Sequence, residues 1–280
     1  MSEDLHSYLQ QIESNWHQSQ QPCKTCPHWA TGGFSRPFFA ASREGNLDAD
    51  VVFIGKEPGT NTDKPPTEWH REGISLTEAK KRMATRDWSP SEFPRDNSAM
   101  FSDHLLEIAV GKKAPLKEPS DSPSYKYYLT NAKKCHETYD DLDEPFLPDE
   151  GDYSEAADHC TEYLSEELKL IKPKIVVTLG SPATKAVFSR FDSLPPKSNA
   201  PKLEEGFFDK FETPDWTLIP AIHPTNTNVR FNQFQKSALI EPILNSYAEQ
   251  GKIKDLGDFN GSAAREAYFN LLRQRIENLL

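Results

Sequence analysis

Short apolar runs, bounded by glycine, proline or polar residues, recur along the chain and predict buried strands. The run Val51–Ile54 is continuously apolar, which is typical of a parallel strand covered on both faces. Between such runs, apolar residues recur at the spacing of one helix face. We predict strands over 50–54, 127–132, 175–179 and 217–222, and helices over 3–20, 97–110, about 153–171, 182–190, 228–250 and 262–280.

Strands that alternate with helical segments indicate a mostly parallel sheet with helices on both faces. The sequence therefore predicts the α/β class, as a three-layer α/β/α fold with a central, mostly parallel four-stranded sheet. No internal repeat or composition break divides the chain, so we expect one domain over residues 1–280. We expect Ser181 to cap the helix that follows the third strand, and a loop over 192–215.

Three of the predicted strands end in residues that can contact a ligand. The glycine-bracketed loop 55–63 follows the first strand, Asn131 ends the second, and His223 follows the fourth. The carboxyl ends of parallel strands share one edge, so these residues can line one pocket. An amide that donates and accepts, an imidazole and a closely approaching glycine backbone suit a flat, polar heterocycle. The alternative is that Asn131 and His223 cap ordinary turns.

The charge balance argues against non-specific binding of nucleic acid. The 280-residue chain carries a formal net charge of −11, and such binding depends on neutralising phosphates. Three basic clusters, 80–82, 112–113 and 133–134, are expected to be solvated faces of helices or loops. No apolar run approaches the roughly 20 residues needed to span a bilayer, and the N-terminus does not resemble a signal peptide. We expect a cytoplasmic, monomeric protein that does not bind membranes.

The four cysteines are Cys23, Cys26, Cys135 and Cys160, and the first two form one CxxC pair. Such a set in a protein of a reducing compartment favours a metal or cluster site over disulfides. The spacing alone leaves zinc and a 4Fe–4S cluster as equal alternatives, and Cys135 and Cys160 could simply be buried. The P-loop, GxSxG and HExxH motifs do not occur.

Five segments, taken in this order, together resemble the iron–sulfur branch (families 4 and 5) of the uracil-DNA glycosylase superfamily. The resemblance covers roughly residues 20–245, and it implies a 4Fe–4S cluster on Cys23, Cys26, Cys135 and Cys160 that holds DNA-contacting loops. It also implies a pocket at the carboxyl edge of a four-stranded parallel sheet. The segments are CKTC (23–26), GNLDADVVFIGKEPG (45–59), YLTNAKKC (128–135), CTEYLSEELKLIKPKIVVTLGSPA (160–183) and IPAIHP (219–224).

The resemblance also assigns roles to single residues. Asn131 would bind the extruded base by hydrogen bonds, and His223 would stabilise the departing base anion. The backbone of Gly55, Pro58 and Gly59 would line the pocket. The segment 224–231 would enter the minor groove, with Thr225, Arg230 and Phe231 against DNA: Arg230 on a phosphate and Phe231 as a wedge that helps extrude the base.

The chain departs from the family pattern in its first motif. The usual GEAPG reads GKEPG here, so Lys56 replaces the acidic residue. Glu57 and Asp63 are then the acids that could place the attacking water. The aromatic segment that stacks on uracil in the family is not evident, and Phe101 is a possible substitute.

We therefore expect a DNA glycosylase that hydrolyses the N-glycosidic bond of uracil, or of a related damaged or modified base, in base excision repair. Its partner would be DNA with the base extruded, and its cofactor a 4Fe–4S cluster, with zinc as the alternative. Because Lys56 replaces the usual acid, two other members of the same fold stay open. One has an altered base specificity, and the other binds DNA or bases without catalysis.

Overall fold

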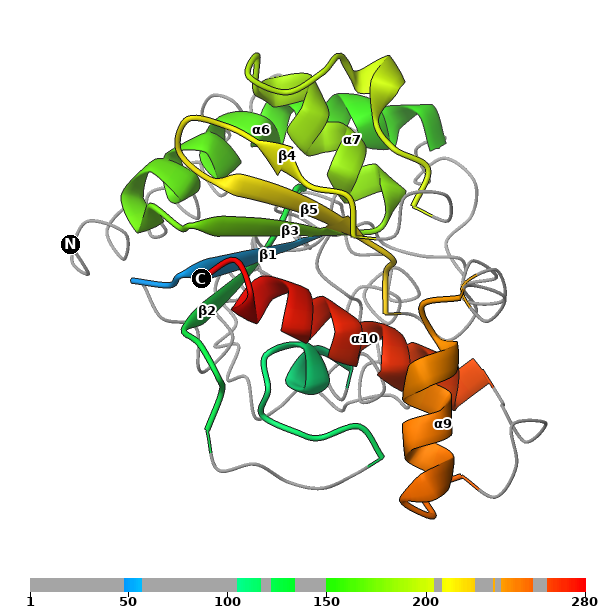
Figure 1. The fold of residues 1–280 in the computed structure, drawn as a ribbon. Helices are drawn as coiled ribbons and strands as arrows, with labels where there is room; N and C mark the ends of the chain where they lie inside the picture. The colour runs from blue at the N-terminus through cyan, green and yellow to red at the C-terminus, as the bar shows by residue number, and fades with distance from the viewer. Residues whose placement is uncertain are drawn as a thin grey trace, which may run out of the picture.

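The structure of the protein is a computed structural model. It describes residues 48–56, 105–116, 122–133, 150–203, 208–224, 234, 238–253 and 261–280, with side chains for all of these except 150–156 and 261–262. Helices lie above and below a twisted sheet, which gives three layers (Figure 1).

The sheet has five strands in the order β2-β1-β3-β5-β4. The four predicted strands are all present, and each pairs in parallel with its neighbour. The fifth, β4, is a short antiparallel edge strand within the segment 192–215 that was expected to be a loop, so that expectation was wrong there. The strands are β1 (Val51–Gly55), β2 (Tyr127–Asn131), β3 (Ile175–Leu179), β4 (Phe211–Glu212) and β5 (Thr217–Ala221).

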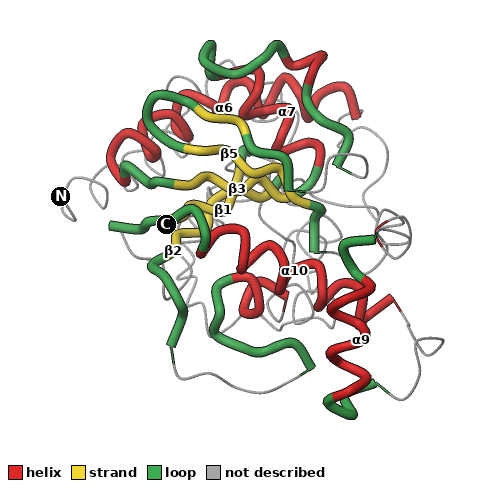
Figure 2. The backbone as a smooth tube through the Cα atoms, viewed as in Figure 1, coloured by secondary structure: helices red, strands yellow, loops and turns green. Residues whose placement is uncertain are grey.

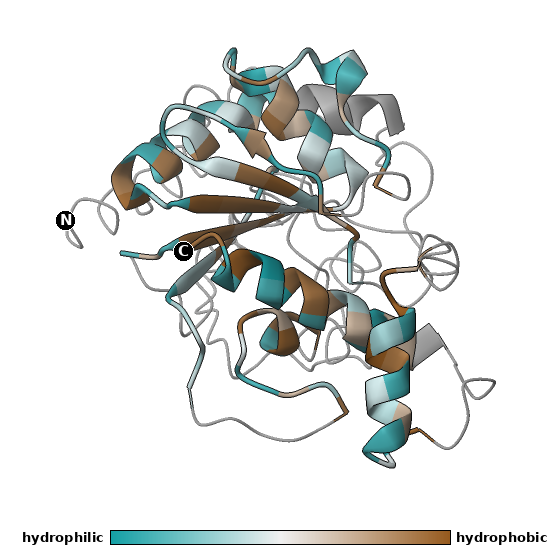
Figure 3. Cartoon of the chain, viewed as in Figure 1, coloured by the Kyte–Doolittle hydropathy of each residue, from teal (hydrophilic) through white to brown (hydrophobic). Residues whose placement is uncertain are grey.

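Alternate residues of each central strand enter different cores, as the two-residue period of a strand requires. In β1, Val51 and Phe53 pack into the core below the sheet, whereas Val52 and Ile54 pack into the core above it. All four side chains are at most 1% exposed, which explains why this run is apolar without alternation. Figure 3 shows the apolar colouring of the sheet interior and of the helix faces that cover it.

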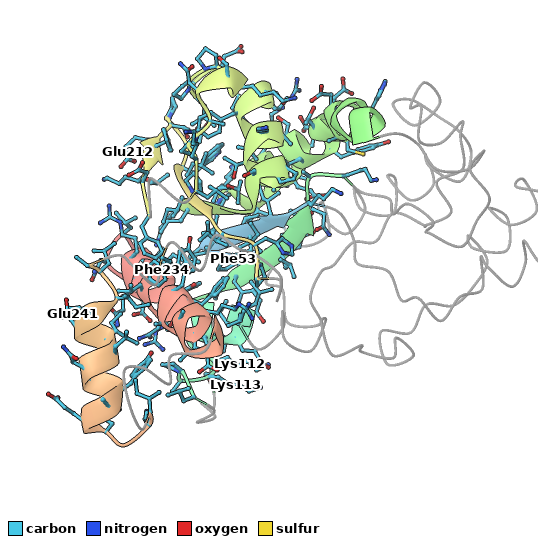
Figure 4. The ribbon with its side chains drawn as sticks, turned by 90° about the vertical axis from the view of Figure 1, so that its right-hand side faces the viewer. Phe53, Lys112, Lys113, Glu212, Phe234 and Glu241 are labelled. Carbon is cyan, nitrogen blue, oxygen red and sulfur yellow. The ribbon has the colours of Figure 1, made fainter. Side chains whose placement is uncertain are left out.

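The helices divide between the two faces of the sheet (Figure 2). Helices α6 and α7 cover one face, and α10 covers the other together with a helical turn over residues 105–109. Figure 4 places Phe53 and Phe234 in the layer between the sheet and α10. The helix bounds are α6 (Glu150–Ile171), α7 (Ser181–Arg190), η3 (Lys197–Asn199), α9 (Glu241–Glu249) and α10 (Gly261–Glu277).

Three helix boundaries differ from the predicted ones. α6 begins at Glu150, three residues before the start that the sequence places near Tyr153, and α9 begins at Glu241 because 238–240 form a turn. Ser181 is the first residue of α7 and not its cap, because Gly180 occupies the cap position without a side-chain hydrogen bond. Within the described segments, none of the helices combines the length and apolar character required to cross a bilayer.

Candidate functional site

The carboxyl ends of the four parallel strands lie side by side along one edge of the sheet. The two outer parallel strands, β2 and β5, lead into Asn131 and His223. The two inner strands, β1 and β3, lead into Gly55 and Gly180. The edge therefore carries two polar side chains with two glycines between them, and we call the space above these glycines the slot.

Asn131 lies across the end of β1. A Cβ atom on Gly55 would stand 2.4 Å from Asn131 Oδ1, far inside van der Waals contact. Gly55 and Asn131 are direct partners in the β1–β2 register. Since β1 lies between β2 and the rest of the sheet, an amide that passes over Gly55 extends toward His223. Only glycine at position 55 leaves this path open.

The backbone beyond Asn131 is fixed by a continuation of the β1–β2 pairing. The Ala132 N–H donates to the Gly55 carbonyl at 2.9 Å, and the Lys133 N–H donates to the Lys56 carbonyl at 3.0 Å. Asn131 is 9% exposed, so its amide lies in a largely enclosed position. Two main-chain hydrogen bonds past the strand end therefore hold Asn131 in register with β1.

His223 lies against the turn between β3 and α7. Gly180 has a φ of +89°, and a Cβ atom there would approach His223 Cβ to 3.1 Å. The Gly180 N–H donates to the Ala221 carbonyl at 2.7 Å, which ties this turn to the end of β5. A side chain at position 180 would be strained and would also crowd the imidazole, so glycine fits on both grounds.

Two buried threonines brace this turn from beneath. The Thr184 hydroxyl donates to the Gly180 carbonyl at 3.0 Å, and it lies 2.8 Å from the Thr178 hydroxyl. Thr178 is on β3 and Thr184 is on α7, so the pair joins the strand to the helix on either side of the glycine. The hydroxyls give the turn a defined geometry inside an otherwise apolar layer.

The strand order fixes the spacing between Asn131 and His223. Asn131 and His223 follow strands that are separated by two others, so their backbones stand roughly 14 Å apart at about 4.8 Å per strand. Asn131 and His223, which the sequence placed together, are thus on one edge of the sheet, each beside a glycine.

The electrostatics of the slot favour a neutral imidazole. Burial lowers the pKa of His223 below its ordinary value of 6.5, and the positive charge of Lys56 lowers this pKa further. Lys56 directly follows β1 and is half-buried. At neutral pH His223 is therefore a neutral donor of one N–H, and positive charge comes from the lysine that replaces the family's acidic residue.

Cys160 is the one cysteine among the described residues, and it is 7% exposed on α6. It lies two helical turns before Glu167, on the same helix face, and Glu167 accepts a hydrogen bond from Thr130 on β2 at 2.8 Å. Because α6 runs back toward the start of β3, its earlier turns project toward the carboxyl edge. The chain that leads to Cys135 leaves β2 at this edge, so the placement of Cys160 fits a cluster shared by the two.

The described residues contain no group of three or more metal-binding side chains, and three of the four predicted thiolate ligands lie outside them. Several other predicted site residues also fall outside the described ranges, so their expected roles stay predictions. The predicted residues outside the description are Cys23, Cys26, Cys135, Glu57, Pro58, Gly59, Asp63, Phe101, Thr225, Arg230 and Phe231.

The expectation that Lys133 belongs to a solvated basic face was wrong. Its side chain is fully buried, with 0% exposure, directly after Asn131 and Ala132. In the basic pair 112–113, Lys113 forms an ion pair with Glu107. Figure 4 shows Lys112 and Lys113 together on the α10 side of the molecule. Gly180 was predicted only to end a strand. A glycine between a buried strand and a helix also indicates that a ligand or a neighbouring segment approaches the backbone closely there.

Comparison with known proteins agrees with this geometry. The family model "Uracil DNA glycosylase superfamily" matches residues 42–246, which contain all four parallel strands and the slot. The type-4 uracil-DNA glycosylase of Sulfurisphaera tokodaii is 24% identical over 237 residues, covering 84% of this chain and 80% of that protein. The match to more than half of the chain shows that this protein belongs to the uracil DNA glycosylase superfamily.

Proposed function

We propose that the protein is a DNA glycosylase that releases uracil from DNA by hydrolysing the N-glycosidic bond. The observation that carries the proposal is the arrangement of Asn131 and His223 on either side of a slot with a glycine floor. The separation of about 14 Å between their backbones, from the strand spacing, would leave room for one base. Both groups come from the strand edge where open α/β sheets bind their ligands.

In the proposed reaction, Asn131 holds the extruded base by its amide while the bond from the sugar C1′ to the base nitrogen lengthens. The electron pair of this bond leaves with the base, and the sugar becomes oxocarbenium-like. His223 donates a hydrogen bond to the base as its negative charge develops. Water then adds to C1′, and its proton is lost to the base anion or to solvent. Most of the catalysis would come from electrostatic stabilisation of the departing base.

Lys56 supports the proposal and also directs attention to base specificity. Its charge acts on His223 and therefore on the same space that the departing anion would occupy. An ammonium near the leaving group stabilises negative charge, which offsets the absence of the acid usually found at this position. The same charge favours bases with carbonyl oxygens on the edge that faces it. A related base with such an edge, including a deaminated purine, is therefore the second proposed substrate.

The proposed 4Fe–4S cluster would be held by Cys23, Cys26, Cys135 and Cys160. When bound, it would cross-link the chain near the slot and hold the neighbouring segments in place. Cys160 supports this assignment by its burial on α6 beside the carboxyl edge. Anaerobically purified protein should absorb near ~400 nm, and Cys160→Ser should reduce this absorbance together with thermal stability. Retention of zinc without such absorbance would favour the alternative metal.

The proposed activity is tested by incubating purified protein with single- and double-stranded oligonucleotides that carry one uracil. Free uracil is measured by chromatography, and the abasic product by alkaline cleavage. We expect release by the natural protein, and a loss of about 10²–10³-fold in His223→Ala or Asn131→Ala. Asn199→Ala, at an exposed asparagine of the helix η3, is the matched control and should retain activity.

Parallel reactions with hypoxanthine and xanthine oligonucleotides test the second substrate class. Release of one of these bases without release of uracil would assign an altered specificity. Binding of DNA without release of any base would contradict a glycosylase and favour the non-catalytic alternative.

A further inference from the structure

The last helix of the chain contacts the segment that carries His223. The hydroxyl of Tyr268, on α10, accepts a hydrogen bond from the Ile222 N–H at 2.9 Å. The two residues are 46 positions apart in the sequence, and both are buried, with 1% and 0% exposure. Ile222 is the first residue after β5 and the last before His223.

This hydrogen bond replaces the one that the sheet cannot supply. The Thr217 N–H donates to the Lys174 carbonyl and the Ala221 carbonyl accepts from the Gly180 N–H, so these two residues of β5 face β3. The Ile222 N–H therefore points to the opposite side of β5, where β4 pairs only with Thr217 and Leu218. A buried N–H without a partner is destabilising, so the chain would otherwise turn to find one. The Tyr268 hydroxyl satisfies the donor and so fixes the backbone direction with which the chain enters His223.

The position of that hydroxyl is itself fixed by aromatic packing. The centroid of the Tyr268 ring lies 4.9 Å from the ring centroid of Phe208, 5.0 Å from that of Phe234 and 5.3 Å from that of Phe269. Three ring contacts leave little freedom for the tyrosine to rotate or withdraw. The acceptor is therefore a rigid point in the core below the sheet.

Tyr268 lies outside residues 42–246, the part of the chain that matches the superfamily. We propose that Tyr268 is a positioning residue: through the Ile222 N–H its hydroxyl sets the place of the His223 imidazole above Gly180. This inference rests on the proposed function for its catalytic consequence. Its structural part, the dependence of His223 on α10, stands independently of the reaction.

The variant Tyr268→Phe tests the inference because it removes only the hydroxyl and keeps the ring. We expect kcat for base release to fall about tenfold with little change in KM, since a small displacement of a catalytic group has a large effect on rate. The matched control is Tyr125→Phe, which also removes a buried tyrosine hydroxyl. This hydroxyl donates a hydrogen bond to the Ala109 carbonyl at 2.5 Å. Tyr125 lies in the same core as Tyr268. Removing the Tyr125 hydroxyl should lower the free energy of unfolding without lowering kcat.

A double-mutant cycle with His223→Ala separates positioning from a general loss of structure. If Tyr268 acts through His223, Tyr268→Phe should cause no further loss of rate in the His223→Ala background. A tenfold loss in both backgrounds would overturn the inference. Equal effects of Tyr268→Phe and Tyr125→Phe on kcat would overturn it as well.

A measurement that does not need activity keeps the inference distinct from the proposed function. The imidazole proton resonances of His223, assigned by comparison with His223→Ala, should move in Tyr268→Phe and stay in place in Tyr125→Phe. Unchanged resonances in Tyr268→Phe would contradict the inference. If the natural protein releases no base, the proposed function fails, and the resonances still decide the role of Tyr268.

Discussion

The Asn131 side of the slot is held by main-chain hydrogen bonds between adjacent strands, whereas the His223 side depends on contacts from separate elements. Asn131 stays in register because the β1–β2 pairing continues for two residues beyond it. His223 is held by the Gly180 turn on one side and, one residue earlier, by Tyr268 of α10 on another.

This difference separates contacts made within the segment that matches the superfamily from a contact made by a helix outside that segment. The Asn131 side follows from strand pairing within the segment that matches the superfamily. The His223 side needs a tyrosine from a helix outside that segment. We therefore expect the Asn131 side to tolerate changes in α10, and the His223 side to respond to them.

The largest effect is expected from Gly55→Ala, which breaks the Asn131 side alone. The new methyl group would occupy the position of Asn131 Oδ1, so the amide must rotate out of the slot. Release of uracil should fall about 100-fold. The measurement is kcat/KM on a uracil oligonucleotide, with the resonances of His223 as an internal check that its side is unchanged. Activity within twofold of the natural protein would contradict the placement of Asn131.

A smaller effect, about tenfold on kcat, is expected from Gly180→Ala, which crowds the His223 side. The variant also forces an alanine to a φ of 89° and a ψ of 161°, a combination that essentially only glycine adopts, at a stability cost on the order of 1–3 kcal/mol. Gly251→Ala is the matched control, since Gly251 has a φ of +68° and no neighbour within 4 Å of the added methyl group. Both variants should lose stability in denaturant titrations, but only Gly180→Ala should lose activity.

A still smaller effect is expected from Lys56→Met, which removes charge from the slot while keeping the stem of the side chain. The pKa of His223 should rise toward 6.5, because one of the two causes of its depression is gone. The acid limb of the pH–rate profile should therefore move to higher pH, and the rate at neutral pH should fall a few-fold. Proton resonances of His223 followed against pH give the pKa directly. A pKa that does not change would show that Lys56 does not act on this imidazole.

The smallest predicted effect concerns stability. Because the folded protein lowers the pKa of His223, the unfolded chain binds this proton at higher pH than the folded protein does. The free energy of unfolding should therefore decrease as the pH falls below about 6.5, the ordinary value. The free energy of unfolding should also decrease with falling pH in Lys56→Met. The decrease should be shallower than in the natural protein, because the pKa of His223 in the folded variant lies closer to its ordinary value. Urea titrations between neutral and mildly acidic pH measure both slopes.

Much of the fold could be predicted because its strands are short, apolar and bounded by clear breaks. The four parallel strands and the shared edge of Asn131 and His223 follow from local pattern and from general sheet geometry. The short edge strand β4 escaped prediction because two residues carry no period. It is defined by pairing with β5 and by the hydrogen bond from Thr217 to Glu212 at 2.6 Å.

The contacts that hold the site could not be predicted in the same way, because they join residues far apart in the sequence. The helical spacing around Tyr268 predicts only that its ring is buried, and the hydroxyl's partner depends on how α10 packs under β5. Lys133 was misjudged because a lysine pair predicts a solvated face, whereas the extended β1–β2 pairing carries this lysine into the interior. Non-local packing overrides the local preference at both positions.

We propose that one extruded base lies between Asn131 and His223. A crystal structure of the protein with uncleavable DNA would show the position of this base. An oligonucleotide that carries 2′-fluoro-arabino-deoxyuridine keeps the uracil attached, because the fluorine disfavours an oxocarbenium-like sugar. We expect uracil above Gly55 and Gly180, with its polar edges hydrogen-bonded to the Asn131 amide on one side and the His223 imidazole on the other. A uracil that contacts neither residue, or that binds elsewhere on the sheet, would contradict it.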